Sequence, residues 1–275
     1  TFGFDPFLSH VGEISNVGTE ISINWIDNLN DNLSYSIESN LSYNKNELSK
    51  ITNQFFSNQI GGSINNGQYT KKVSVGQPLG SFFLYEVEGI DDKGQFLYKN
   101  QNNDNEINEE DRRFFGSFIP SISIASIFKI EYKNIDINLD LYGNFGNVVY
   151  NGKKAQRFGN ENIEQYVFNN RWTTGRPSST TQKASNSVPL SSNYFLESGD
   201  FFRINNLTIG YTFNSSKSKI FKNIRSYITA KNPLVLKRFS GFTPELPGDP
   251  LGSAGIELDA YPTLSSYFIG FNLSF

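Results

Sequence analysis

The sequence predicts an all-β protein whose strands form part of a large antiparallel transmembrane β-barrel. Seven segments alternate apolar and polar residues with a period of two, at about the 9–11 residues that a strand needs to cross a bilayer. Short and long connections alternate between these segments. Aromatic residues make up 15% of a chain that is only 37% apolar, which suits an apolar outer band around a watery interior better than a solid core.

The composition excludes several classes of protein. The chain has no Cys, so a disulfide framework and a thiolate metal site are both excluded. No apolar run approaches the roughly 18 residues of a membrane helix, and no signal peptide opens the chain. The net charge of −3 comes without a basic stripe, so we expect no nucleic-acid partner. The sequence also lacks Met, so we expect the chain to be a fragment of something longer.

The first four predicted strands form two hairpins. Strands 19–27 and 33–43 are joined by an Asn-rich turn, and strands 121–132 and 135–146 by Lys133-Asn134. Asp136 and Asp140 lie on the polar face of the fourth strand. They could form a catalytic carboxylate pair, but a watery lumen explains them better, because acid–base catalysis needs two contrasting environments.

The last three predicted strands are 201–213, 224–232 and 263–275. In the final strand the odd positions from Tyr267 to Phe275 are all apolar or aromatic, while Gly270, Asn272 and Ser274 face the other way. This alternation is typical of a strand with one apolar and one polar face. We expect the odd face to meet lipid and the even face to meet the lumen.

The long connections, at about 44–119, 147–198 and 233–262, all fall on one side of the predicted sheet. Outer-membrane barrels sort their connections in this way, with short periplasmic turns and long extracellular loops. The C-terminus would then be periplasmic. A secreted β-sandwich shares the alternating strands but has no reason to sort its loops. Because seven is odd and below the minimum of eight strands, we expect the C-terminal portion of a larger barrel.

Eight short stretches in order along the chain resemble the C-terminal part of SusC/RagA-type TonB-dependent transporters of Gram-negative outer membranes. They are VGTE (17–20), GQPLGSFF (76–83), INEEDR (107–112), YKNID (132–136), SGDFFRINNLTIGY (198–211), TAKNP (229–233), GFTPE (241–245) and GFNLSF (270–275). The resemblance implies that residues 1–275 belong to one barrel domain of 22 strands, as strands 16 to 22.

The resemblance also implies a function and partners. The family imports oligosaccharides or peptides through the outer membrane with energy transmitted by TonB, and a SusD-like surface lipoprotein covers the barrel outside. The plug domain and the TonB-contacting segment would lie upstream of this chain. Phe271, Leu273 and Phe275 fit the terminal strand that serves as the membrane assembly signal for the barrel assembly machinery.

One loop follows the twelve-position calcium pattern. Oxygen-bearing side chains stand at positions 1, 3, 5, 9 and 12, and position 7 would offer its backbone carbonyl. Asn replaces the usual Gly at position 6, where Asn105 can adopt the same left-handed backbone. An Asn-rich turn held by its own hydrogen bonds is the alternative. The expected ligands of a weakly bound Ca²⁺ are Asn100, Asn102, Asp104, Glu106, Asn108 and Asp111.

Aromatic residues have two expected roles. Trp25, Tyr132, Tyr211 and Tyr267 would contact lipid or form girdles on the outer face. Phe82, Phe83, Tyr85 and Trp172 in the loops could stack on a sugar or peptide, or pack between loops. We also expect a short helix near 162–170. His10, the only histidine, is expected to be solvated.

Import of a large nutrient is the leading functional hypothesis. An outer-membrane adhesin or scaffold is an alternative, because long loops would serve it equally well. A barrel enzyme is a weaker one, since a single histidine and the absence of a nucleophile elbow offer no triad.

Overall fold

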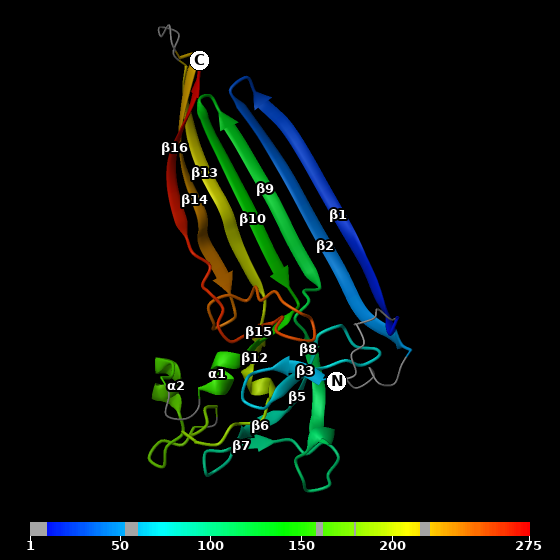
Figure 1. Cartoon of the computed structure of the whole chain (residues 1–275). Helices are drawn as coiled ribbons and strands as arrows, with labels where there is room; N and C mark the ends of the chain where they lie inside the picture. The colour runs from blue at the N-terminus through cyan, green and yellow to red at the C-terminus, as the bar shows by residue number, and fades with distance from the viewer. Residues whose placement is uncertain (1–9, 53–59, 158–161, 179, 215–220) are drawn as a thin grey trace, which may run out of the picture.

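A seven-stranded antiparallel sheet dominates the computed structural model (Figure 1), which describes residues 10–52, 60–157, 162–178, 180–214 and 221–275. Each strand of this sheet pairs with the next one along the chain. All seven predicted strands are confirmed, in the predicted order. They are β1 (Gly12–Asn30), β2 (Leu33–Ile51), β9 (Ile122–Tyr132), β10 (Ile135–Phe145), β13 (Phe201–Asn214), β14 (Asn223–Lys237) and β16 (Ser266–Ser274).

Several strands extend further toward the long connections than the sequence predicts. β1 and β2 continue their pairing through Asn16 and Asn46, whose side chains share a hydrogen bond of 2.7 Å. Polar residues here follow no alternation, so the pattern could not reveal this extension. β14 passes through Pro233, which lies at a register shift between β13 and β14. A bulge tolerates proline because it needs no ladder hydrogen bond from that residue.

The register aligns apolar residues across the whole sheet. One row crosses all seven strands with apolar or aromatic side chains throughout, and an adjacent row places four isoleucines side by side on β10, β13, β14 and β16. The first row is Trp25, Ile37, Phe128, Leu139, Leu207, Ala230 and Tyr267, and the second is Ile137, Ile209, Ile228 and Ile269. Because a slip of one residue would move every side chain to the other face, this register fixes one apolar face.

The opposite face of the sheet is mainly polar. Its matching row is Asn24, Glu38, Ile127, Asp140, Asn206, Lys231 and Ser266. The predicted division of the strands into an apolar and a polar face is therefore confirmed. Trp25, Tyr132, Tyr211 and Tyr267 are all exposed on the apolar face, as expected.

The three long connections are not simple loops. They fold together beyond one end of the large sheet (Figure 1), and we call this body the loop lobe, comprising the described residues of 60–120, 146–200 and 238–262. Its strands are β3 (Ile60–Ser63), β4 (Tyr69–Lys72), β5 (Ser81–Tyr85), β6 (Val87–Ile90), β7 (Phe96–Tyr98), β8 (Arg112–Ser117), β11 (Val148–Asn151), β12 (Leu196–Ser198) and β15 (Ile256–Glu257). They form sheets in the orders β3-β4-β5-β8, β6-β7 and β12-β11-β15.

Short helices complete the lobe. They are α1 (Gly152–Gln156), α2 (Gln165–Asn170) and the 3-10 turns η2 (Glu109–Asp111) and η3 (Asn193–Phe195). α2 confirms the helix expected near 162–170. Among the described residues, none of the helices has the length and apolar character to cross a membrane.

The hydrophobic core lies in the loop lobe. Its buried members come from all three long connections: Ile64, Phe82, Leu84, Phe96, Tyr150, Ala155, Phe195 and Ile256. Phe82 is fully buried and Tyr85 nearly so, so these two aromatics pack between segments. The long connections predicted at about 44–119, 147–198 and 233–262 thus each contribute strands and core residues to one folded body.

Candidate functional site

The expected calcium loop, residues 100–111, connects β7 to η2 and β8. Asn105, at the sixth position, has a φ of 68°, and Asn103 has a φ of 61°. The left-handed backbone predicted for Asn105 is therefore present, and asparagine is among the few residues that adopt it readily.

Asp104 lies at the centre of this loop. Its carboxylate accepts hydrogen bonds from the amide nitrogens of Asn102 at 2.8 Å and of Asn100 and Asn108 at 3.4 Å. It also accepts the backbone N–H of Glu106 at 2.9 Å. The bond from the Glu106 N–H, together with those from the amides, holds the pKa of Asp104 below its usual value.

Asp111 has a different role from Asp104. Its side chain is fully buried, and its two oxygens accept the backbone N–H groups of Gln101 at 2.7 Å and Asn108 at 2.9 Å. Asn108 in turn caps η2 by accepting the N–H of Glu110. Asp111 therefore closes the loop as an internal hydrogen-bond acceptor.

The six expected calcium ligands lie close together in the loop, but their oxygen atoms are not arranged around one common centre. The carbonyl oxygens of Asn100, Asn102 and Asn108 each accept a backbone N–H, and Glu106 takes part through its backbone. No group of three or more His, Cys, Asp or Glu suited to a metal occurs within the described ranges. The calcium site stays a prediction, and an ion there would require the amides to turn their oxygens inward.

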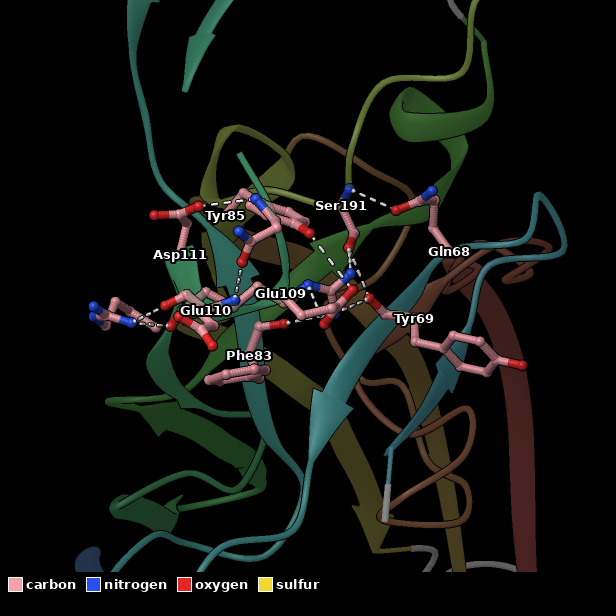
Figure 2. Close-up of polar contacts among 11 residues, drawn as sticks. Gln68, Tyr69, Phe83, Tyr85, Glu109, Glu110, Asp111 and Ser191 are labelled. Carbon is pink, nitrogen blue, oxygen red and sulfur yellow. Dashed lines mark hydrogen bonds and ion pairs between the residues drawn. The ribbon is translucent and has the colours of Figure 1, made fainter. Parts of the chain in front are cut away.

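The residue after Asp111 anchors this loop to the rest of the lobe (Figure 2). Arg112 is 4% exposed, and its guanidinium donates to the carbonyl of Tyr69 at 3.2 Å and to Ser191 Oγ at 3.2 Å. It pairs with Glu109 at 3.2 Å and lies 4.7 Å from the centroid of the Tyr85 ring. A planar guanidinium with several fixed donors suits such a buried junction.

A second buried cation joins the first and third long connections. Lys71 is fully buried, and its ammonium donates to the carbonyls of Pro250 at 2.8 Å, Gly252 at 3.3 Å and Ala254. The Phe118 ring centroid lies 4.9 Å away. Burial lowers the pKa of Lys71 to about 8, while the charge of Asp249 acts to raise it.

One ion pair and one anchored carboxylate join the second and third long connections. Lys153 on α1 pairs at 3.0 Å with Glu257, which is fully buried. Lys154 pairs at 2.7 Å with Glu197, which also accepts the N–H of Ser240 at 2.7 Å. Burial raises the pKa of Glu197, but the hydrogen bonds from Lys154 and Ser240 outweigh it and hold the pKa below its usual value.

Each pair of long connections is thus bound by a buried charged side chain. Arg112 links the first to the second, Lys71 the first to the third, and Lys153 with Glu257 the second to the third. The sequence alone pointed to Arg112 only as part of a family motif, and it did not reveal Lys71, Lys153 or Glu257. Their partners lie far away in the chain, so no local spacing could have revealed them.

The remaining candidates fall outside this cluster. Asp136 is bonded through both carboxylate oxygens to Arg225 on β14, whereas Asp140 pairs across the sheet with Asn206. The two aspartates therefore have different surroundings on the polar face. His10 is exposed, as expected. Phe271 and Leu273 are exposed on the apolar face of β16, and the Phe275 ring lies 5.3 Å from that of Phe221.

The chain has relatives among known proteins, although no family model matches it. It is 25% identical to the TonB-dependent receptor SusC of Bacteroides thetaiotaomicron over 97% of this chain and 27% of that protein. It is also 25% identical to the TonB-dependent receptor P3 of Formosa agariphila, over 99% of this chain and 30% of that protein. The chain thus spans less than a third of the length of these relatives.

Solved structures share the fold. The RagAB peptide transporter matches with a TM-score of 0.78 at 21% identity, over 96% of this chain and 30% of that one. The same importer in its open-open state matches with a TM-score of 0.73 at 20% identity, over 96% of this chain and 29% of that one. The sheet, the loop lobe and these likenesses identify the chain as SusC/RagA-like: it resembles less than a third of the length of TonB-dependent receptors of this type and shares the fold of the matching part of RagAB.

Proposed function

We propose that this chain forms part of the wall and outer face of an outer-membrane transporter that imports a large nutrient, an oligosaccharide or a peptide, with energy from TonB. The observation that carries the proposal is the division of one sheet into an apolar and a polar face across seven strands. A wall of this kind separates lipid from a watery channel.

The arrangement of the connections supports an orientation. The β1–β2 and β9–β10 turns lie at one end of the sheet and the loop lobe at the other (Figure 1). Outer-membrane barrels keep short turns on the periplasmic side, so we place the loop lobe outside the cell. The end of β16 then faces the periplasm.

The loop lobe supports a binding role outside the cell. Buried ion pairs and a shared core tie its three segments together, so it offers a fixed surface rather than independent flexible loops. A fixed surface loses little conformational entropy when a partner docks on it. We infer that a SusD-like surface lipoprotein docks here, and that TonB acts through parts of the transporter that this chain does not cover.

Uptake by whole cells tests this proposal. A strain lacking the transporter should fail to take up a labelled oligosaccharide or peptide that wild-type cells import, and dissipating the proton-motive force should stop import in wild-type cells. A lipoprotein should also co-purify with the tagged transporter after gentle extraction. Uptake that continues in wild-type cells after the proton-motive force is dissipated would contradict the proposal. A strain lacking the protein that still takes up the ligand but no longer attaches to surfaces would instead favour the adhesin or scaffold.

A further inference from the structure

A pocket at one edge of the loop lobe combines positive charge with exposed aromatic rings. It has a volume of about 260 Å³ and lies between the end of α1, α2, residues 180–183 and the start of β12. Figure 1 places α1 and α2 next to each other at this edge. The charged residues lining the pocket are Lys154, Arg157, Arg171, Lys183, Glu164 and Glu197.

The charges of the pocket do not balance. Glu197 is already bound to Lys154 at 2.7 Å and to Asn151 at 3.0 Å. That leaves Arg157, Arg171 and Lys183 facing one carboxylate, Glu164. Within the part of the chain that the structure describes, none of these three cations forms an ion pair. Three cations and one carboxylate around a small cavity leave a net positive charge, which attracts an anion.

Arg171 gives a second sign of a missing partner. Its Nε atom is buried and has no hydrogen-bond partner among the described residues. A buried donor without a partner is costly, and native proteins generally satisfy such groups. A carboxylate in the pocket would supply the acceptor once the guanidinium turns toward the cavity, because guanidinium groups bind carboxylates through paired hydrogen bonds.

Helix capping does not explain these arginines. Arg157 and Arg171 are the C-cap residues of α1 and α2, but only their backbone N–H groups bond to the helices. The helices have five and six residues, so the charge at their ends is small. The side chains are therefore available to a ligand.

Two tyrosines complete the pocket. Tyr166 is 67% exposed, and Tyr194 is 36% exposed, although its ring is held against Phe96 at a centroid distance of 4.6 Å. Exposed aromatic faces of this kind can stack on the apolar face of a saccharide ring. A sugar that also carries a carboxylate would engage both the rings and the cations.

We propose that this pocket binds the carboxylate of an acidic sugar unit in the ligand of the transporter, an inference that rests on the proposed import function. The volume is slightly below the roughly 300–1,000 Å³ of pockets that enclose a drug-sized ligand. The pocket therefore holds one unit of an oligosaccharide, and the rest of the ligand extends into the surrounding space.

Binding to the whole detergent-purified transporter tests this inference. The probes are oligogalacturonate, a neutral oligosaccharide of equal length and oligoglutamate. Arg171→Gln and Arg157→Gln should each weaken oligogalacturonate binding about tenfold or more, the loss expected for one charge-assisted hydrogen bond. Arg176→Gln, in the same segment but outside the pocket, should leave binding unchanged.

Three outcomes would overturn the inference: equal binding of the neutral oligosaccharide, binding of oligoglutamate alone, or an Arg171→Gln variant that binds as tightly as the wild type. Retained uptake and a retained lipoprotein partner, together with one of these outcomes, would overturn the pocket but leave the import function intact. Loss of energy-dependent uptake of every ligand in wild-type cells would instead overturn the import function.

Discussion

Asp136 on β10 and Arg225 on β14 are joined directly across the intervening strand β13. Arg225 Nε donates to Asp136 Oδ1 at 2.7 Å, and Nη2 donates to Oδ2. The bridge passes over Gly210, where a Cβ atom would lie 2.4 Å from Asp136 Oδ1 and 2.7 Å from Arg225 Nε. The missing side chain of Gly210 is what allows strands that are not neighbours to share an ion pair.

Gly210→Leu should break this bridge. We expect the variant to lose about 1 kcal/mol of stability through the ion pair, because both partners have side chains only 27% exposed. Urea unfolding of the whole barrel in detergent measures the loss. Asp136→Asn should cost a similar amount alone and add little in the Gly210→Leu background, whereas full additivity of the two changes would contradict the bridge.

An arginine on the apolar face should impair membrane insertion. Ile137→Arg places a charge in the row of isoleucines on β10, β13, β14 and β16, and near the bilayer centre this costs about 2–4 kcal/mol. Asn138→Arg, the next residue on the opposite face, is the matched control. Folding yield into lipid vesicles should fall for the first variant alone, and equal yields would refute a lipid-facing row.

The buried Lys71 predicts a pH dependence of the loop lobe. Its pKa is lowered to about 8 from 10.5, so the unfolded chain holds this proton more tightly than the folded one. Stability should therefore rise with pH between about 8 and 10.5, by up to about 3 kcal/mol. Hydrogen exchange of lobe amides measures it, and Lys71→Met should remove the slope. The same slope in both proteins would exclude Lys71 as its source.

The calcium hypothesis can be separated from the hydrogen-bonded turn at Asp104. If Ca²⁺ binds residues 100–111, millimolar Ca²⁺ should slow proteolysis of this loop in the wild type but not in Asp104→Asn. Asp92→Asn, outside the loop, should behave as the wild type. Equal cleavage of the wild type with and without Ca²⁺ would contradict calcium binding. The turn would then be stabilised by its own hydrogen bonds alone.

The large sheet was predictable because its signal is local. Alternation along each strand and the short turns determine the pairing, as in β9 and β10 joined at Lys133-Asn134. The lobe was not predictable because its bonds are long-range. Lys71 contacts carbonyls near residue 252, and Arg112 contacts Ser191. Neither partner leaves a periodic pattern in the sequence.

The residues of the pocket could not be predicted from local sequence patterns either. Sequence reasoning considered Trp172 and the aromatics of the first loop as ligand contacts, yet Phe82 and Tyr85 are buried. The exposed rings are Tyr166 and Tyr194, which reach one cavity with Arg157 and Arg171 only after the chain folds. Their spacing in the sequence follows no motif.

The most direct test of the barrel wall uses single cysteines on β10, which the natural chain lacks. Cysteines replacing Ile137, Asn138, Leu139 and Asp140 are labelled with a fluorophore in the whole transporter and placed in vesicles with quencher-bearing lipids. Strong quenching at 137 and 139 with weak quenching at 138 and 140 is the predicted result. Equal quenching at all four positions would contradict a sheet with one face in lipid and the other in water.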